Sequence, residues 1–286
     1  MATLIDGKSL ALEIREEVRK QVVSLVEKNG ITPHLAVILV GDNPASQSYV
    51  RGKENACKKS GIKSTVIRVD ASVTQEELIN IVDQLNNDES VHGILLQLPI
   101  PKHLNAEAVI ERISSSKDVD GFTPKNVALL TNGQPHLVPC TPLGIIRILK
   151  KYQIQIEGKH CVVIGRSQIV GKPMASLLLK ENGTVTICHS KTSDLSAITK
   201  AADILVVAMG KPKMISGNYI KPGATVIDVG ISKINDEMVG DVDFESAEPV
   251  SGFITPVPGG VGPMTIACLL ENTLLCYDSL VVKKND

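Results

Sequence analysis

Tyr49 and Lys53 lie four residues apart in the stretch SYVRGKENAC, so on a helix they share one face with the apolar Ala56 and Cys57. A lysine on such a face usually extends its amine to water, and this simple interpretation applies to Lys53 as well. If the face borders a ligand cleft, partial desolvation disfavours the charged amine. Lys53 is then a candidate proton donor and acceptor, with Tyr49 beside it.

The helix that must carry this pair is predicted from its two ends. Asn43 is a residue type favoured as a helix cap, Pro44 is favoured at the first helical position, and Gly61 is favoured just past the last turn. Lys58 and Lys59 follow the apolar face and are predicted to face solvent.

A second candidate site is the turn in VVIGRSQIVGKPMA, residues 162–175, where an apolar run leads into Gly165, Arg166 and Ser167 and then into a helical pattern. Backbone N–H groups and the helix dipole at such a turn suit a pyrophosphate. The spacing differs from G-x-G-x-x-G because Ser167 stands where the second glycine would be. On spacing alone, a tight turn without a ligand is an equal alternative.

The end of the next strand distinguishes the two nicotinamide dinucleotides. In NAD-binding folds an acid at this place bonds the ribose hydroxyls, about 20 residues after the glycine turn. Here TVTIC is followed by His189, Ser190 and Lys191. A guanidinium at Arg166 and a hydroxyl at Ser190 suit the extra phosphate of NADP, which a carboxylate would repel. The alternative is that Arg166 and Lys191 are solvated surface charges.

Three more features are candidate ligand contacts. Gln97 interrupts GILLQLPIP near the carboxyl end of a predicted buried strand, where open α/β sheets bind ligands. Asp118 and Asp120 occur in KDVDGF, and residues 255–265, TPVPGGVGPMT, form a loop whose glycines let the backbone approach a ligand closely. The simpler interpretations are a glutamine bonded to loop backbone, a turn at Asp120 and an ordinary flexible loop.

The scaffold for these residues is predicted from alternating β-rich runs and amphipathic stretches, which indicate a parallel α/β architecture. The runs are LAVILVG, STVIRV, GILLQLP, CVVIG, TVTIC, DILVVAMG and ATVIDVG. Between the third and fourth runs, residues 118–144 are rich in Pro, Gly and Asn, so we expect an irregular connection with a domain boundary near its end. The prediction is two α/β lobes with a cleft between them.

Composition limits the class of protein. The chain has 286 residues, 43% of them hydrophobic and 21% charged, with a net charge of −1, as expected for about two soluble domains with no nucleic-acid partner. Asp6 and Lys8 interrupt any signal peptide, and the apolar runs are shorter than the ~18 residues that span a bilayer, so we expect a cytoplasmic protein without a membrane partner. The six scattered cysteines predict reduced, buried thiols and no metal site.

A Y-x-x-x-K pair also marks short-chain dehydrogenases, in which the tyrosine protonates a carbonyl and the lysine supports it. In that class the dinucleotide turn opens the chain and the pair follows much later. Here the pair at residues 49–53 precedes the turn at Gly165 by more than a hundred residues. The two elements therefore belong to different lobes, which argues against this class.

Taken together, the motifs resemble the methylenetetrahydrofolate dehydrogenase/cyclohydrolase family. The resemblance covers nearly the whole chain, and the PGGVGPMT loop and the GRS-x-x-VG-x-P turn are highly specific. The motifs that carry it, in the family's order, are VGDNPASQSYVRGKENACKKSGI, GILLQLPIP, KDVDGF, PCTPLG, VIGRSQIVGKPMA, TICHSKT, DVGI, GDVDF and PVPGGVGPMT.

The resemblance implies roles for the matching residues. Lys53 matches the family's catalytic lysine and Tyr49 its active-site tyrosine. Gln97 and Asp120 match the residues that assist the lysine and hold the pterin. The matching folate contacts are Leu96, Leu98, Pro258, Gly259, Gly260, Val261 and Gly262. The matching NADP contacts are Gly165, Arg166, Ser167, Ser190 and Ile231.

The resemblance also implies a catalytic domain of residues 1–139, to which a final helix (263–286) returns, and a Rossmann-like NADP domain of residues 140–262. Family members are commonly homodimers. The implied chemistry is NADP-dependent oxidation of methylenetetrahydrofolate to methenyltetrahydrofolate, followed by hydrolysis to formyltetrahydrofolate. The implied cofactor is therefore NADP, and the implied substrates are tetrahydrofolate derivatives.

One loop departs from the family pattern, because Ala128 and Leu129 in NVALL stand where many members have the glycine and arginine of N-x-G-R-L. Two other classes stay open at this point. A different two-domain NADP dehydrogenase, such as a shikimate-type enzyme, would lack PGGVGPMT, and a non-enzymatic folate or nucleotide binder would not need Lys53.

Overall fold

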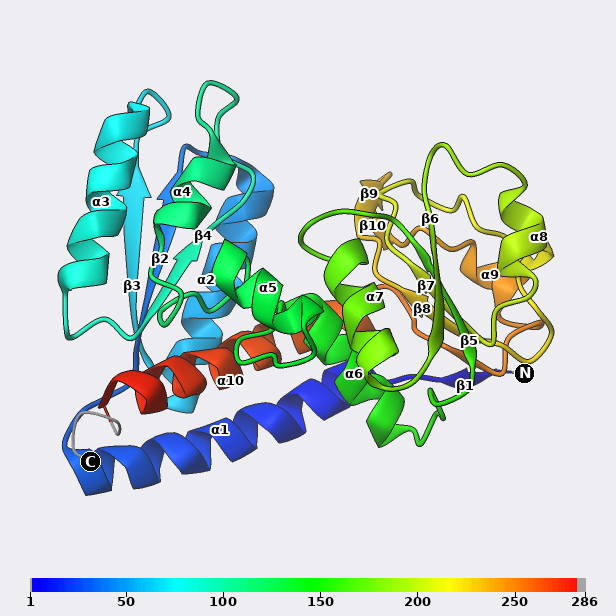
Figure 1. The fold of residues 1–286 in the computed structure, drawn as a ribbon, viewed down its shortest axis with the longest axis horizontal. Helices are drawn as coiled ribbons and strands as arrows, with labels where there is room; N and C mark the ends of the chain where they lie inside the picture. Colours follow the sequence, from blue (N-terminus) through cyan, green and yellow to red (C-terminus); the bar gives the residue numbers. More distant parts are fainter. Residues whose placement is uncertain (1, 282–286) are drawn as a thin grey trace. The chain divides into compact units, whose positions relative to one another are not determined.

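The structure is a computed structural model that describes residues 2–281 (Figure 1). The chain forms two compact units. Unit 1 contains Met1–Ala11 and Thr141–Thr265, and unit 2 contains Leu12–Cys140 and Ile266–Asp286.

Unit 2 is built on a parallel sheet with strand order β3-β2-β4. Its strands are β2 (His34–Val40), β3 (Lys63–Val69) and β4 (Gly93–Leu96). Its helices are α1 (Gly7–Asn29, entering from unit 1), α2 (Pro44–Ser60), α3 (Gln75–Asn87), α4 (Ala106–Arg112), α5 (Pro124–Thr131) and α10 (Val261–Val281, also entering from unit 1). Every residue of β2 is buried, because parallel strands are covered on both faces.

The core of unit 2 follows from the alternation of side chains along β2. Ala36, Ile38 and Val40 share one face and pack with Leu78 of α3 and Val109 of α4. Figure 1 shows α3 and α4 on this side of the sheet and α2 on the other. Helix α2 packs along β2 and β3 and buries one face.

The predicted irregular connection is wrong in part. Within residues 118–144 the structure contains all of α5 and the start of α6 (Cys140–Lys151). Pro124 occupies the first turn of α5, where its missing N–H costs nothing, and the following NVALL favours a helix. The residues at both ends of α5 are typical of turns, so this short helix was not predicted.

Unit 1 is built on a second parallel sheet, with strand order β1-β11-β8-β7-β5-β6. Its strands are β1 (Thr3–Leu4), β5 (His160–Ile164), β6 (Thr184–Cys188), β7 (Ile204–Val207), β8 (Thr225–Asp228) and β11 (Phe253–Ile254), beside a hairpin of β9 (Ser232–Ile234) and β10 (Glu237–Val239). Its helices are α6, α7 (Gly171–Lys180), α8 (Leu195–Thr199), the 3₁₀ turn η1 (Gly217–Tyr219) and α9 (Phe244–Ala247). These elements form the expected α/β fold of the second lobe.

The amino terminus lies in unit 1, whereas the resemblance placed it in the amino-terminal domain. The N–H of Thr3 donates to the Gly252 carbonyl at 2.8 Å, and the N–H of Ile5 donates to the Ile254 carbonyl at 2.9 Å. These bonds add β1 to the sheet beside β11. Two residues are too short a strand to predict from alternation.

Helix α10 is long and apolar enough to cross a membrane by length and composition alone. However, 61% of its apolar window is buried inside the structure, as in the core helix of a globular domain. Polar residues such as Asn272 interrupt this segment, so it contains no continuous apolar run of that length. The predicted returning helix includes residues 282–286, which lie outside the described residues.

Candidate functional site

Helix α2 presents Lys53 on a buried face. The Asn43 side chain accepts a hydrogen bond from the Ser46 N–H at 3.0 Å, and Gly61 ends the helix in the left-handed region at φ 76°. Lys53 is only 8% exposed, whereas Tyr49 is 41% exposed. The predicted ends of the helix are thus confirmed, but Tyr49 lies at the solvent edge rather than on the buried face.

The Lys53 ammonium donates a hydrogen bond to Oε1 of Gln97 at 2.9 Å. The Gln97 Nε2 group donates to the Leu98 carbonyl at 2.7 Å, so the amide can turn only its oxygen toward the lysine. Gln97 directly follows β4, and its own N–H is held by the Ile38 carbonyl at 2.9 Å. The end of β4 therefore fixes the Gln97 oxygen as an acceptor for Lys53. The other two N–H groups of Lys53 have no acceptor among the described residues.

Asp120 lies close enough to Lys53 for the two charges to interact. Burial raises the pKa of Asp120 to about 6, while the Lys53 ammonium opposes that rise. The Cys140 thiol contacts Asp120 Oδ1 at 3.8 Å and the Val119 carbonyl at 3.4 Å. Lys53, Gln97 and Asp120 thus form one polar group in unit 2.

Asp118 builds the turn that carries Asp120. Its carboxylate accepts from the N–H groups of Phe122 and Thr123 at 3.2 and 2.8 Å, and from Asn126 Nδ2 at 2.9 Å. Asp118 is 1% exposed, so these three donors satisfy a carboxylate that would otherwise be costly to bury. The two aspartates of KDVDGF therefore differ in environment: Asp118 is saturated with donors and Asp120 is not.

The predicted folate residues fall in both units. In unit 2, Leu96 is buried at the end of β4 and Leu98 is partly buried just beyond Gln97. In unit 1, the loop of residues 258–262 lines a small cavity of about 110 Å³ together with Ile231. A Cβ at Gly260 would lie 2.6 Å from the Pro256 carbonyl oxygen, so this loop needs glycine for packing.

The glycine turn of unit 1 joins β5 to α7. Gly165 has φ 129°, and a Cβ there would lie 2.2 Å from the Ala208 carbonyl oxygen. A Cβ at Gly171 would lie 2.2 Å from the Gly165 carbonyl oxygen, so strand and helix approach too closely for any side chain. The Ser167 hydroxyl accepts weakly from the N–H groups of Val170 and Gly171, at 3.2 and 3.3 Å, and so takes the place of a cap.

Beside this turn is a cavity of about 500 Å³ at the carboxyl ends of β5, β6 and β7. Gly165, Arg166, Ser167 and Ser190 line it, so the structure brings together four of the five predicted cofactor residues. Ile231 lines the smaller cavity instead. None of the residues lining the larger cavity is Asp or Glu.

Other residues that line the larger cavity were not predicted from the sequence. Lys211 and Met209 line it from the segment after β7, and Tyr219 lines it from η1. Met209 and Lys211 could have been predicted, because parallel sheets bind ligands at the carboxyl ends of their strands. Both residues belong to AMGK, which lies at the carboxyl end of a predicted strand. Lys211 places a second cation at the cavity, in addition to Arg166.

A buried aspartate braces the rim of this cavity. Asp241 is fully buried, and its Oδ2 atom accepts from the N–H groups of Met209 and Gly210 at 2.7 and 2.8 Å. Asp228, at the end of β8, in turn accepts from the N–H groups of Asp241 and Val242 at 3.0 and 2.9 Å. The DVGI and GDVDF motifs therefore hold each other and the segment after β7.

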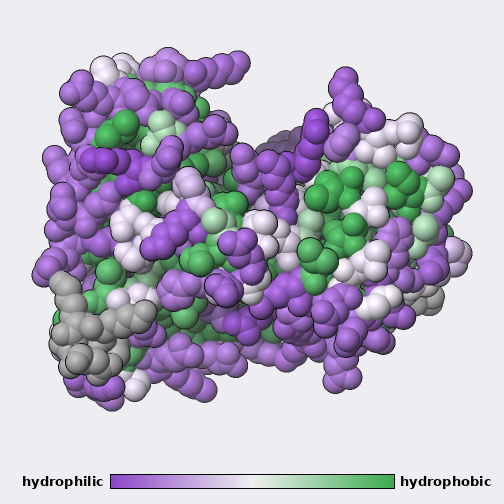
Figure 2. Space-filling model, viewed as in Figure 1, coloured by the Kyte–Doolittle hydropathy of each residue, from purple (hydrophilic) through white to green (hydrophobic). Residues whose placement is uncertain are grey.

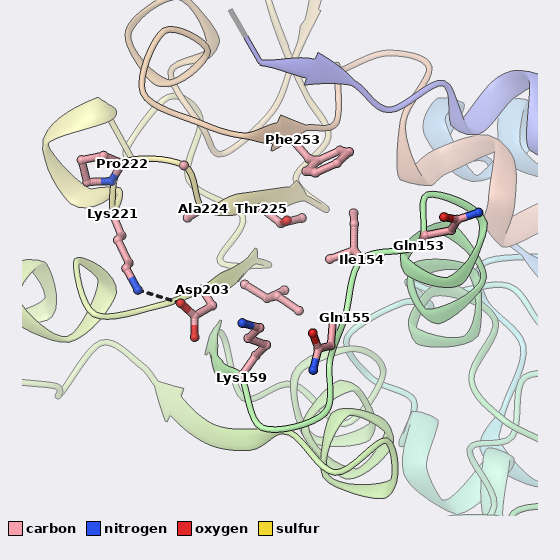
Figure 3. A pocket seen from close by; sticks show the side chains of 12 residues that line it. Gln153, Ile154, Gln155, Lys159, Asp203, Lys221, Pro222, Ala224, Thr225 and Phe253 are labelled. Carbon is pink, nitrogen blue, oxygen red and sulfur yellow. Dashed lines mark hydrogen bonds and ion pairs between the residues drawn. The ribbon is translucent and has the colours of Figure 1, made fainter.

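A further cavity, of about 410 Å³, lies at the amino ends of β5, β7 and β8 (Figure 3). Lys159, Asp203 and Lys221 line it, and the Lys221 ammonium pairs with Asp203 at 2.7 Å. Open parallel sheets bind ligands at the other, carboxyl, edge. It contains none of the predicted site residues, so we assign it no part in the reaction.

The chain was compared with known proteins. Residues 5–120 match the catalytic domain of the tetrahydrofolate dehydrogenase/cyclohydrolase family, and residues 139–280 match the NAD(P)-binding domain of the same family. The chain belongs to this family. It is therefore an enzyme of one-carbon metabolism with dehydrogenase and cyclohydrolase activities on tetrahydrofolate, and a shikimate-type enzyme or a non-enzymatic binder is excluded.

Individual relatives agree with this over their full length. The chain is 57% identical to the "Bifunctional protein FolD" of Listeria innocua over 96% of each chain. It is 51% identical, with a TM-score of 0.96, to the solved structure of the bifunctional enzyme FolD from Campylobacter jejuni, covering 98% of this chain and 99% of that one. It is 40% identical, with a TM-score of 0.94, to the Trypanosoma brucei enzyme, solved with NADP and an inhibitor, covering 97% and 98%. The predicted family, fold class and enzyme class are confirmed.

Proposed function

We propose that this enzyme oxidises methylenetetrahydrofolate with NADP and then hydrolyses the methenyl product to formyltetrahydrofolate, with Lys53 as the proton-transfer group of the hydrolysis. The observation that carries the assignment of Lys53 is its buried hydrogen bond to Gln97 beside Asp120. NADP, when bound, supplies the hydride acceptor for the first reaction. The residues of this chain position the folate and manage protons.

The hydrolysis needs one group that serves as base and then as acid. Lys53, in its neutral form, takes a proton from the attacking water as the C–O bond forms at the methenyl carbon. It then returns that proton to the ring nitrogen as the C–N bond breaks. The remaining hydroxyl proton of the adduct is released to solvent as its oxygen becomes the formyl carbonyl. Gln97 accepts from the protonated amine and fixes its direction, and Asp120 holds the pterin and balances the charge of the lysine. Tyr49, at the solvent edge of α2, contacts the substrate.

The cavity beside Gly165 fits NADP. Glycines at the turn let the pyrophosphate approach the backbone, and the start of α7 supplies N–H groups and the positive end of its dipole. Arg166 and Ser190 would hold the 2′-phosphate, which no carboxylate of this cavity would repel. Ile231 would contact the cofactor from the separate segment after β8. The folate contacts are Leu96, Leu98 and residues 258–262.

Replacing Arg166 with alanine is expected to weaken NADP binding more than NAD binding. A charge-assisted phosphate contact contributes about 1.5–3 kcal/mol, or roughly 10–150-fold in affinity. The measurement is KM for each cofactor in the wild type, in Arg166→Ala and in Lys180→Ala, which removes an exposed cation from the last turn of α7 as a control. Equal use of NADP and NAD by the wild type would contradict the assignment.

The proposed assembly is a homodimer in the cytoplasm. Strand β6 is an edge of the unit 1 sheet, and Figure 2 shows apolar side chains exposed over this part of the surface. Ile187 of β6 is 40% exposed and Leu179 of α7 is 65% exposed, which favours cover by a second copy. Sedimentation equilibrium is expected to give the mass of a dimer and, for Ile187→Glu, a shift toward monomer. A monomeric wild type would contradict this.

A further inference from the structure

Asn272 is an unusual residue for its position in the fold. It lies in the middle of α10 and is fully buried, among neighbours such as Leu269 and Leu270 that pack as ordinary core residues. Its Nδ2 group donates to the Val119 carbonyl at 2.7 Å and to the Val138 carbonyl at 2.8 Å. One amide therefore holds two segments of unit 2 that are far from it in sequence.

The two carbonyls flank the proposed catalytic group. The Val119 carbonyl is part of the peptide bond that joins Val119 to Asp120. The hydrogen bond from Asn272 is therefore one peptide unit away from Asp120. The Val138 carbonyl lies two residues before Cys140, whose thiol contacts both the Val119 carbonyl and Asp120. Asn272 is also 3.6 Å from Cys140 Sγ.

Asparagine at this position destabilises the fold, so the packing of the core does not explain why it is there. The Oδ1 atom of Asn272 is buried and has no hydrogen-bond partner among the described residues, and an unpaired buried polar atom is destabilising. A leucine would fill a similar volume in an apolar helix without that cost. The two N–H donors are what asparagine supplies and leucine lacks.

We infer that Asn272 is a positioning residue for the reaction: its amide fixes the backbone at Val119 and thereby the place of the Asp120 carboxylate relative to Lys53. The inference rests on the proposed role of Asp120. Asn272 does not touch the substrate, and all of its effect passes through the turn that carries Asp120.

The test compares Asn272→Leu and Asn272→Ser with Thr273→Val. The first removes both donors at similar volume, and the second leaves one short hydroxyl. Thr273 is equally buried on the same helix, but its hydroxyl bonds only the Leu269 carbonyl within the helix. We expect both Asn272 variants to lose at least tenfold in kcat for both reactions, with KM for NADP within twofold of wild type. Thr273→Val should keep the wild-type kcat even if its Tm falls as far as that of the Asn272 variants.

A double-mutant cycle separates positioning from general damage. In an Asp120→Ala background, Asn272→Ser should cause no further loss of kcat, because the group it positions is absent. An equal loss in both backgrounds overturns the inference, as does a folded Asn272→Ser enzyme with kcat within twofold of wild type. If Asp120→Ala alone keeps wild-type activity, the proposed role of Asp120 fails, and the inference with it. Impairment by Asp120→Ala without impairment by the Asn272 variants overturns the inference alone.

Discussion

Replacing Lys53 with methionine is expected to lower cyclohydrolase turnover by about 10²–10⁴-fold, the usual range for loss of a general acid–base group. Methionine fills much of the volume of the lysine stem and removes the amine that donates to Gln97. Hydride transfer moves no proton at this lysine, so the dehydrogenase step should retain more activity than the hydrolysis. The measurement is methenyl hydrolysis and NADPH formation, assayed separately.

The matched control is Lys58→Met, which removes an exposed lysine from the same helix. It should leave both activities within about twofold, since surface substitutions away from special features have small effects. Wild-type hydrolysis by a folded Lys53→Met protein would show that the buried lysine only supports the structure of unit 2.

Replacing Asp120 with alanine should reduce kcat/KM for folate by roughly 10–150-fold in both reactions, because it removes the carboxylate proposed to hold the pterin and a hydrogen bond to a charged group contributes about 1.5–3 kcal/mol. The affinity for NADP should stay near that of the wild type, since the glycine turn and its cavity belong to unit 1. Cofactor titration and steady-state folate kinetics measure the two effects. A comparable loss for both ligands contradicts this division.

Asp120→Asn adds a pH test. Burial raises the pKa of Asp120 to about 6 from an ordinary value near 3.8, so the folded state binds the proton more tightly than the unfolded chain does. The stability that this group contributes is full below about pH 4 and declines as pH rises through about 6. Urea unfolding of the wild type should show this decline over that interval. The asparagine variant, which cannot ionise, should show a smaller one.

The fold was largely predictable because its signals are local. Asn43, Pro44 and Gly61 mark the ends of α2, and the seven β-rich runs mark β2 to β8, whereas the two-residue strands β1 and β11 carry no such signal. The short helix α5 was not predicted, since turn-forming residues surround it. The exposure of Tyr49 was not predicted either, because helical spacing assigns a residue to a face without saying where that face stops being buried.

The parts of the candidate site that escaped prediction depend on contacts distant in sequence. Asn272 bonds a carbonyl 153 residues away, and no local pattern distinguishes it from a tolerated polar residue in a helix. Likewise, Asp118 and Asp120 have the same residue type in one motif. Only the backbone donors around Asp118 show which carboxylate organises the turn and which one stays available.

The six thiols have a consequence for covalent chemistry. All six cysteines lie within the described residues, and each is free and buried, as the composition predicted; they are Cys57, Cys140, Cys161, Cys188, Cys268 and Cys276. Burial raises the pKa of Cys57 to about 12 and that of Cys140 well above its usual value, so little thiolate forms near neutral pH. Thiol-alkylating reagents therefore meet a native surface without a reactive cysteine. The rate at which these thiols become labelled therefore reports how often the core opens. A cysteine introduced on the surface would be labelled in preference to the six native ones.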